Sequence, residues 1–171
     1  TVIDRLEGFD VAIFISPTAV AKANAAVRTR RDWPARMKYV AVGSGTAGAL
    51  RGIGAAEVLA PQGRGDSEAV AALPELAEVA GRRIVIFRGQ GGREGLRAAL
   101  EARGAQVEYA ECYRRAMPRV DIGPLMERWR RGGIDAVSIT SAEGLHNLFA
   151  LLGAAGIAGE ALLRAAPVFV P

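Results

Sequence analysis

Glycine, serine and threonine gather in five short segments of the chain, and each segment follows a run of apolar residues. The segments span residues 16–18, 43–46, 61–67, 88–93 and 140–143. Glycine lets a ligand approach the backbone closely, and hydroxyl groups donate hydrogen bonds to anions. These residue types therefore predict a cleft that binds an anionic molecule without a metal ion.

Side chains that commonly carry nucleophilic, acid–base or metal chemistry are scarce. The single cysteine, Cys112, excludes an internal disulfide framework and a multi-cysteine zinc site, and the single histidine, His146, argues against a histidine-rich metal site. We expect the neighbouring Glu111 to raise the pKa of the Cys112 thiol, which argues against a reactive thiolate. No two carboxylates have a spacing that suggests acid–base catalysis.

Two features of the sequence, a glycine pattern and a tyrosine, can each be interpreted in two ways. Gly43, Gly45 and Gly48 match a dinucleotide-binding fingerprint in letters, but Ala60 and Pro61 stand where an acidic residue is expected, so nucleotide binding is only an alternative. Tyr113 closes an apolar run, and two interpretations of it are equally supported. It either covers the edge of a sheet or directs its phenol into a cleft between two domains.

The elements that position these residues are predicted from short apolar runs, which are typical of buried parallel strands. Seven strands are predicted, at 10–16, 39–43, 57–61, 83–89, 106–113, 135–140 and 167–171. The run 106–113 alternates more than the others and is expected at a sheet edge. Between the strands lie helical patterns, including one that begins at Asp66 and Ser67 with a restart at Pro74, and one over 145–152 that ends at Gly153.

Strands that alternate with helices predict an α/β fold of two doubly wound parallel-sheet domains, the second incomplete. The polar segment 114–119, which contains a proline, separates them. Five strands precede it, enough for one complete domain at 1–117. Only two strands follow it, so 118–171 is predicted to be part of a second domain whose other strands are missing.

Composition narrows the class of protein further. Of the 171 residues, 50% are hydrophobic and 23% charged, which excludes global disorder. The longest uncharged stretch near the C-terminus, 148–159, is too short for a membrane span, and the first residues lack the pattern of a secretory signal. We therefore expect a cytoplasmic protein without a membrane partner.

The net charge of +4 comes almost entirely from arginine, because Lys22 and Lys38 are the only lysines among 22 basic residues. Arginine binds carboxylates and phosphates through its planar fork, although codon bias explains most of these arginines more simply. The sequence has no base-reading helix and no aromatic stacking platform, so a nucleic-acid partner is not expected.

Six segments, taken in order, resemble the uroporphyrinogen-III synthase family. They are Phe14 to Val20, Ala41 to Ala47, Pro61 with Ser67 to Ala69, Arg88 to Arg93, Cys112 to Arg115, and Asp135 to Val137 with Thr140 to Glu143. Each segment is a loose match alone, but their order and spacing are specific. The family continues on both sides of this chain. The resemblance therefore implies that 1–117 is a complete inserted domain and that 118–171 lacks the N-terminal and C-terminal parts of its own domain.

The resemblance also implies a reaction. Hydroxymethylbilane, a linear tetrapyrrole with eight carboxylates, loses water, its last ring inverts, and the macrocycle closes to uroporphyrinogen III, a step of haem and other tetrapyrrole synthesis. The family uses no metal and no organic cofactor, and a monomer is expected. By matching position, Tyr113 is the catalytic candidate. The substrate-binding candidates are Ser16, Thr18, Ser44, Thr46, Ser67, Gly91, Thr140, Ser141 and Glu143, several of them through backbone N–H groups.

Two other classes remain open at this point. One is a small-molecule sensor with two lobes and the same cleft but no catalysis. The other is a nucleotide-dependent enzyme that uses the turn at Gly43.

Overall fold

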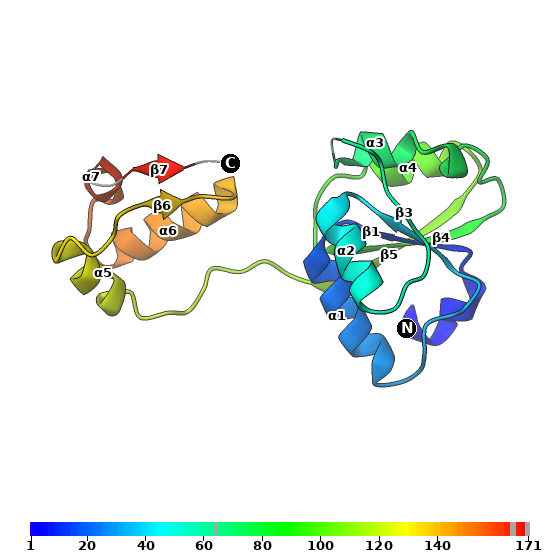
Figure 1. Cartoon of the computed structure of the whole chain (residues 1–171), viewed down its shortest axis with the longest axis horizontal. Helices are drawn as coiled ribbons and strands as arrows, with labels where there is room; N and C mark the ends of the chain where they lie inside the picture. Colours follow the sequence, from blue (N-terminus) through cyan, green and yellow to red (C-terminus); the bar gives the residue numbers. More distant parts are fainter. Residues whose placement is uncertain (64, 165–166, 170–171) are drawn as a thin grey trace. The chain divides into compact units, whose positions relative to one another are not determined.

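The computed structural model describes residues 1–63, 65–164 and 167–169, and the chain forms two compact units (Figure 1). The first unit is Thr1–Arg115 and the second is Ala116–Pro171. The predicted completeness of one domain and incompleteness of the other stay predictions.

Five parallel strands form the sheet of the first unit, in the order β3-β2-β1-β4-β5. They are β1 (Val11–Phe14), β2 (Lys38–Ala41), β3 (Val58–Leu59), β4 (Arg83–Gly89) and β5 (Gln106–Tyr113). The chain builds the sheet outward from β1 to β3, then crosses back to place β4 on the other side of β1. The α/β class and the parallel sheet are confirmed, and β5 lies at an edge as its alternating pattern predicts.

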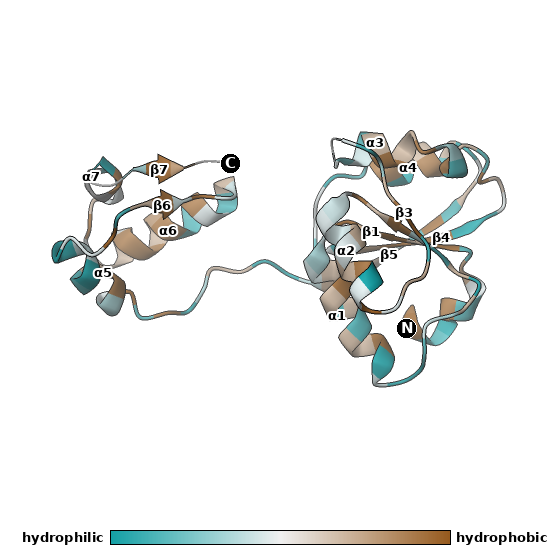
Figure 2. Cartoon of the chain, viewed as in Figure 1, coloured by the Kyte–Doolittle hydropathy of each residue, from teal (hydrophilic) through white to brown (hydrophobic). Residues whose placement is uncertain are grey.

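Helices cover both faces of this sheet. Successive strand residues point to opposite sides, and apolar residues on both sides pack against helices. Ala12 and Phe14 pack under η1 (Ile3–Gly8), α1 (Pro17–Arg28) and α2 (Ser44–Gly52). Val11 and Ile13 pack on the other face, under α3 (Ser67–Ala71), η2 (Pro74–Leu76) and α4 (Gly95–Glu101). Figure 1 shows the two groups of helices on opposite sides, and Figure 2 shows that the strands between them are mainly hydrophobic.

Local sequence explains where these helices begin. Ser16 Oγ accepts a hydrogen bond from the Ala19 N–H at 3.1 Å and caps α1, and Pro17 occupies the first helical position. Asp66 Oδ1 caps α3 in the same way, accepting from the Ala69 N–H at 2.8 Å. The predicted helix start at 66–67 and the restart at Pro74 are therefore confirmed.

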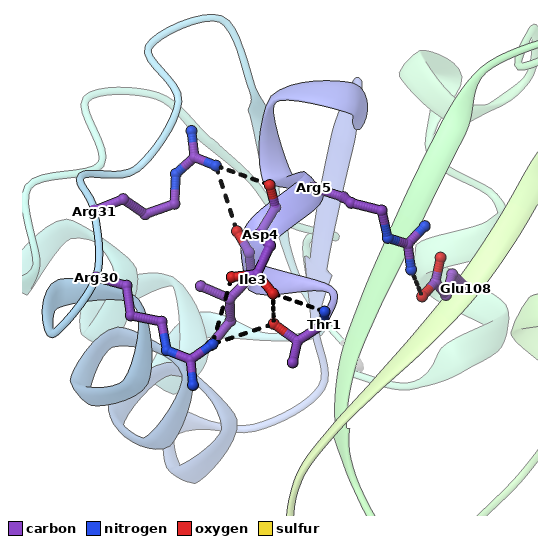
Figure 3. A network of polar contacts seen from close by, with 7 residues as sticks. All are labelled: Thr1, Ile3, Asp4, Arg5, Arg30, Arg31 and Glu108. Atoms are coloured by element: carbon purple, nitrogen blue, oxygen red, sulfur yellow. Dashed lines mark hydrogen bonds and ion pairs between the residues drawn. The ribbon is translucent and has the colours of Figure 1, made fainter.

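A polar network fastens the N-terminal η1 to the rest of the first unit (Figure 3). Arg5 Nη2 donates to Glu108 Oε1 of β5 at 2.7 Å. Arg31 Nη1 donates to the carbonyl oxygens of Ile3 and Asp4, each at 3.4 Å. Most of these groups are exposed, so each contact stabilises the fold only weakly, but together they hold η1 against the end of α1 and the edge strand.

The second unit contains three helices and two strands among its described residues. They are α5 (Gly123–Arg130), β6 (Val137–Ser138), α6 (Ala142–Ala154), α7 (Gly159–Arg164) and β7 (Val168–Phe169). β6 and β7 pair in parallel. The strands predicted at 135–140 and 167–171 are both present but short, and positions 170 and 171 lie outside the described residues.

The end of α6 differs from the prediction. The helix runs past Gly153 to Ala154, and Gly156, with φ of +71°, provides the left-handed residue that ends it. The Gly156 N–H donates to the Gly153 carbonyl at 3.0 Å, and the Ile157 N–H donates to the Leu152 carbonyl at 2.9 Å. This pair of bonds is a Schellman motif, so the stop signal is the glycine that adopts positive φ and not the first glycine after the apolar face.

Candidate functional site

A pocket of about 290 Å³ opens in the first unit at the carboxyl ends of β1, β2 and β4. Its walls come from these strand ends, from segment 65–67 and from the loop after β4. β1 and β4 are the neighbouring strands between which the winding of the sheet reverses. Ligands of open α/β sheets bind at such switch points, so the fold places this pocket where a ligand is expected.

Arg88 is the most unusual side chain of the pocket, because it is only 3% exposed. Its guanidinium lies 4.3 Å from the centre of the Tyr109 ring. Nη1 forms an ion pair with Glu94 Oε1 at 3.0 Å, and Nε donates to the Gly89 carbonyl at 3.2 Å. Sequence reasoning included Arg88 in a glycine-rich loop but did not select it. The sequence feature that could have pointed to Arg88 is a charged residue near the carboxyl end of an otherwise apolar strand.

On the other face of the same sheet edge, Tyr113 and Ser16 form a hydroxyl pair. Tyr113 Oη and Ser16 Oγ are 3.1 Å apart, and either hydroxyl can donate. The Tyr113 ring lies over Gly89, where an added Cβ would come within 2.7 Å of a ring carbon. Tyr113 therefore covers the sheet edge and also brings its phenol to the end of β1.

A β-bulge puts Tyr113 in this position. Arg88 pairs with Glu111, but Gly89 pairs with Tyr113, so Cys112 is an extra residue in β5. Regular alternation would send Tyr113 to the same face as Tyr109. The bulge instead turns Tyr113 to the face covered by α1, where the Ser16 hydroxyl lies.

The structure brings only some of the predicted binding residues together. Ser67 and Gly91 line the pocket, and Ser16 lies beside Tyr113 at the same sheet edge. Thr18 and Ser44 are exposed in the first turns of α1 and α2. Thr46, in the first turn of α2, is only 3% exposed.

Thr140, Ser141 and Glu143 belong to the second unit and are exposed around the start of α6. Ser141 Oγ accepts a hydrogen bond from the Gly144 N–H at 3.0 Å and caps the helix. His146 is exposed on α6, with Nδ1 at 3.1 Å from the Ala142 carbonyl oxygen. Nowhere in the described part of the chain do three histidine, cysteine or acidic side chains come together as a metal site would require.

Replacing Ser16 with alanine is expected to lower the free energy of unfolding by about 1 kcal/mol, the typical cost of losing a helix N-cap. The variant removes the acceptor for the Ala19 N–H and also the partner of the Tyr113 hydroxyl. Urea denaturation followed by circular dichroism measures the change. Thr18→Ala, an exposed substitution two residues away, is the control and is expected to change stability by less than about 0.5 kcal/mol. Equal stabilities of the two variants would contradict the capping role.

Cys112, next to Tyr113 in β5, is partly buried, and this burial raises the pKa of its thiol to about 11. The expected direction is found, but burial is the cause and not the neighbouring Glu111. The Glu111 carboxylate instead accepts a hydrogen bond from the Gly91 N–H at 3.2 Å.

The raised pKa predicts that Cys112 resists alkylation in the folded protein. At pH 8 the thiolate fraction in the native state is on the order of 10⁻³, whereas an unfolded cysteine with a pKa of about 8.5 is roughly one quarter ionised. Iodoacetamide is therefore expected to react at least about 100-fold faster in 8 M urea, as measured by intact mass. The pKa of the Cys112 thiol is higher in the folded protein than in the unfolded chain. Ionisation of this thiol therefore does not change the free energy of unfolding below the unfolded pKa, and it lowers that free energy as the pH rises from there towards 11. Fast labelling of the native protein would contradict the buried thiol.

Among the described residues, no helix is long and apolar enough to cross a membrane.

A doubly wound unit with an arginine-lined pocket at its switch point has the architecture of a small-molecule-binding α/β domain. The chain belongs to the uroporphyrinogen-III synthase family, because the family model described as Uroporphyrinogen-III synthase HemD matches residues 1–170. The resemblance found in the six sequence segments is therefore confirmed.

Individual relatives agree with this assignment. The chain is 40% identical over 155 residues to uroporphyrinogen-III synthase of Salmonella typhimurium, a match that covers 88% of this chain and 63% of the relative. It is 39% identical over 144 residues to the Escherichia coli uroporphyrinogen-III synthase, covering 84% of this chain and 58% of the relative. The chain thus spans less than two thirds of the length of these two relatives.

A solved structure supports the same fold. A mutant uroporphyrinogen III synthase of Thermus thermophilus matches with a TM-score of 0.58 at 24% identity, over 98% of this chain and 66% of that chain.

Proposed function

We propose that this protein is a uroporphyrinogen-III synthase, a lyase that cyclises hydroxymethylbilane to uroporphyrinogen III with loss of water and inversion of ring D. The observation that carries the proposal is the family match over residues 1–170, supported by relatives with 39% and 40% identity. The proposal includes a small-molecule tetrapyrrole substrate, no metal or organic cofactor, and action as a cytoplasmic monomer without a nucleic-acid or membrane partner.

The chemistry explains why a strong nucleophile is not needed. Hydroxymethylbilane loses its hydroxyl group readily because the cation that remains is stabilised by the pyrrole ring. The main task of the protein is then to hold the linear chain so that closure through the inverted ring is faster than direct closure. A site made of hydroxyls, backbone N–H groups and arginines suits this task, since it orients an anionic substrate by many contacts.

Tyr113 is the proposed catalytic residue, and its phenol donates a hydrogen bond to the departing hydroxyl. Ser16 positions that phenol through the 3.1 Å contact between the two hydroxyls. Substrate binding is assigned to Ser16, Thr18, Ser44, Ser67 and Gly91 of the first unit, to the Thr46 backbone, and to Thr140, Ser141 and Glu143 of the second unit.

The decisive assay supplies the full-length protein with hydroxymethylbilane made in situ and separates the oxidised products by isomer. Isomer III above the uncatalysed background of isomer I is the expected result. Isomer I alone, from a protein shown to be folded, would contradict the enzyme and favour a binding protein without catalysis.

A further inference from the structure

Arg88 is held in a way that leaves part of its binding capacity for a ligand. Removing a guanidinium from water is costly unless its donors are satisfied. The hydrogen bonds that Arg88 makes with described residues use Nε and Nη1, and the Nη1 partner, Glu94, has a side chain that is 65% exposed. Glu94 is thus the only charged partner that Arg88 has in the described part of the chain.

Gly92, in the loop after β4, lies beside the remaining donor, Nη2, and has no side chain to crowd it. Gly91 and Gly92 have φ values of +72° and +114°, which favour glycine at both positions. A Cβ on Gly92 would come within 2.8 Å of Arg88 Nη2, so any other residue there would crowd this nitrogen. Both glycines line the pocket together with Arg88.

A second donor lies in the same pocket. Tyr109 Oη is buried and has no partner at hydrogen-bond geometry among the described residues, but it lies close enough to the Glu94 carboxylate to lower the pKa of Glu94. Burial, reinforced by the nearby Glu94 carboxylate, raises the pKa of the Tyr109 phenol, so the phenol stays protonated at neutral pH and can donate. The guanidinium of Arg88 lies 4.3 Å from the centre of the Tyr109 ring, and that of Arg97 lies 5.3 Å from it.

The charge of the pocket favours an anion. Arg88, Arg93 and Arg115 all line it, against one acidic lining residue, Asp66, whose Oδ1 caps α3. Glu94 forms an ion pair with Arg88 but is not one of the residues that line the pocket. A carboxylate matches both the guanidinium fork and the phenol donor.

We propose that Arg88 and the Tyr109 hydroxyl form a subsite that binds one carboxylate side chain of the substrate, with Glu94 holding Arg88 in place until the ligand arrives. The assignment of the carboxylate to a tetrapyrrole rests on the proposed function. Carboxylate binding itself does not, because it follows from the pocket alone. Glu94 and the ligand carboxylate repel each other, so Glu94 acts as a competitor and not as part of the bound state.

The first test uses sodium propionate as the probe and propionamide as its neutral counterpart. In ¹H–¹⁵N spectra of the intact protein, propionate is expected to shift the Gly91, Gly92 and Arg88 Nε–H signals in a saturable way, and propionamide is not. Arg88→Gln is expected to weaken propionate binding about tenfold or more, because a charged hydrogen-bonded partner is lost. Arg82→Gln is the matched control, since Arg82 is exposed and pairs with Asp10 at 3.2 Å outside the pocket. Equal shifts with propionamide, or unchanged binding to Arg88→Gln, would overturn the subsite.

Two milder variants decide the question if Arg88→Gln does not fold. Tyr109→Phe is expected to weaken propionate binding about threefold through the lost hydrogen bond. Glu94→Gln is expected to strengthen it about threefold, because a competing exposed carboxylate is removed. If Glu94 only supports the structure, this variant leaves binding unchanged or weakens it, and either result would overturn the proposal.

The isomer assay then separates this proposal from the proposed function. Arg88→Gln is expected to raise KM for hydroxymethylbilane more than it lowers kcat. A wild-type protein that binds propionate at Arg88 but forms no isomer III would refute the proposed function and leave the carboxylate subsite standing. A wild-type protein that forms isomer III, with unchanged KM in Arg88→Gln, would refute the subsite.

Discussion

Replacing Tyr113 with phenylalanine is expected to lower kcat for uroporphyrinogen III formation about tenfold or more while the protein stays folded. The variant removes only the hydroxyl, which is 3.1 Å from Ser16 Oγ and is proposed to meet the departing hydroxyl of the substrate. A tenfold change corresponds to about 1.4 kcal/mol of transition-state stabilisation, which is within the range of one hydrogen bond. The ring itself remains over Gly89, so the packing of the sheet edge is preserved.

The measurement is single-isomer kinetics on the full-length protein with hydroxymethylbilane made in situ. Tyr39→Phe is the matched control, because Tyr39 lies in β2, packs against Trp33 and does not line the arginine pocket. Its turnover is expected to equal that of the wild type. An unchanged rate in Tyr113→Phe would remove Tyr113 from the mechanism.

The sheet was accessible from sequence because buried parallel strands show as continuous apolar runs. Ile84 to Phe87 is such a run, and all four residues are buried as expected. The edge position of β5 could also be predicted, since polar and apolar residues alternate in its sequence, and Val107 is its only buried residue. The end of α6 could not be predicted, because Gly153 and Gly156 are both glycine and only the backbone conformation shows which of them adopts a positive φ.

The candidate site was harder to predict because it depends on strand order and on one bulge. Neither property is visible in a single sequence. Ser16 follows β1 and Tyr113 ends β5, two strands that are separated by β4, and the two side chains meet because Gly89 of β4 has no side chain. The extra residue at Cys112 then decides which face Tyr113 occupies. Sequence reasoning could therefore select Tyr113 from resemblance, but could not find its contact with Ser16 or the burial of Arg88.

Gly89→Ala is expected to reduce turnover about as much as Tyr113→Phe, although it changes no polar group. The new Cβ would lie 2.7 and 2.8 Å from two carbons of the Tyr113 ring, so the ring must move and its hydroxyl must leave Ser16. Side chains of an edge strand can shift at moderate cost, so we expect a loss of only about 1–3 kcal/mol in unfolding free energy. Gly48→Ala is the control, because nothing lies within 4 Å of a Cβ at that helical position.

The double variant tests whether Gly89 acts through Tyr113. If the methyl group harms catalysis only by displacing the phenol, then Gly89→Ala combined with Tyr113→Phe should be no slower than either variant alone, because both remove the same interaction. Multiplied effects would mean that Gly89 also matters on its other side, where it lines the arginine pocket. Wild-type turnover in Gly89→Ala would show that catalysis does not need the phenol at Ser16. The catalytic role of Tyr113 would then depend on a ring position other than the one held by Gly89 and the bulge.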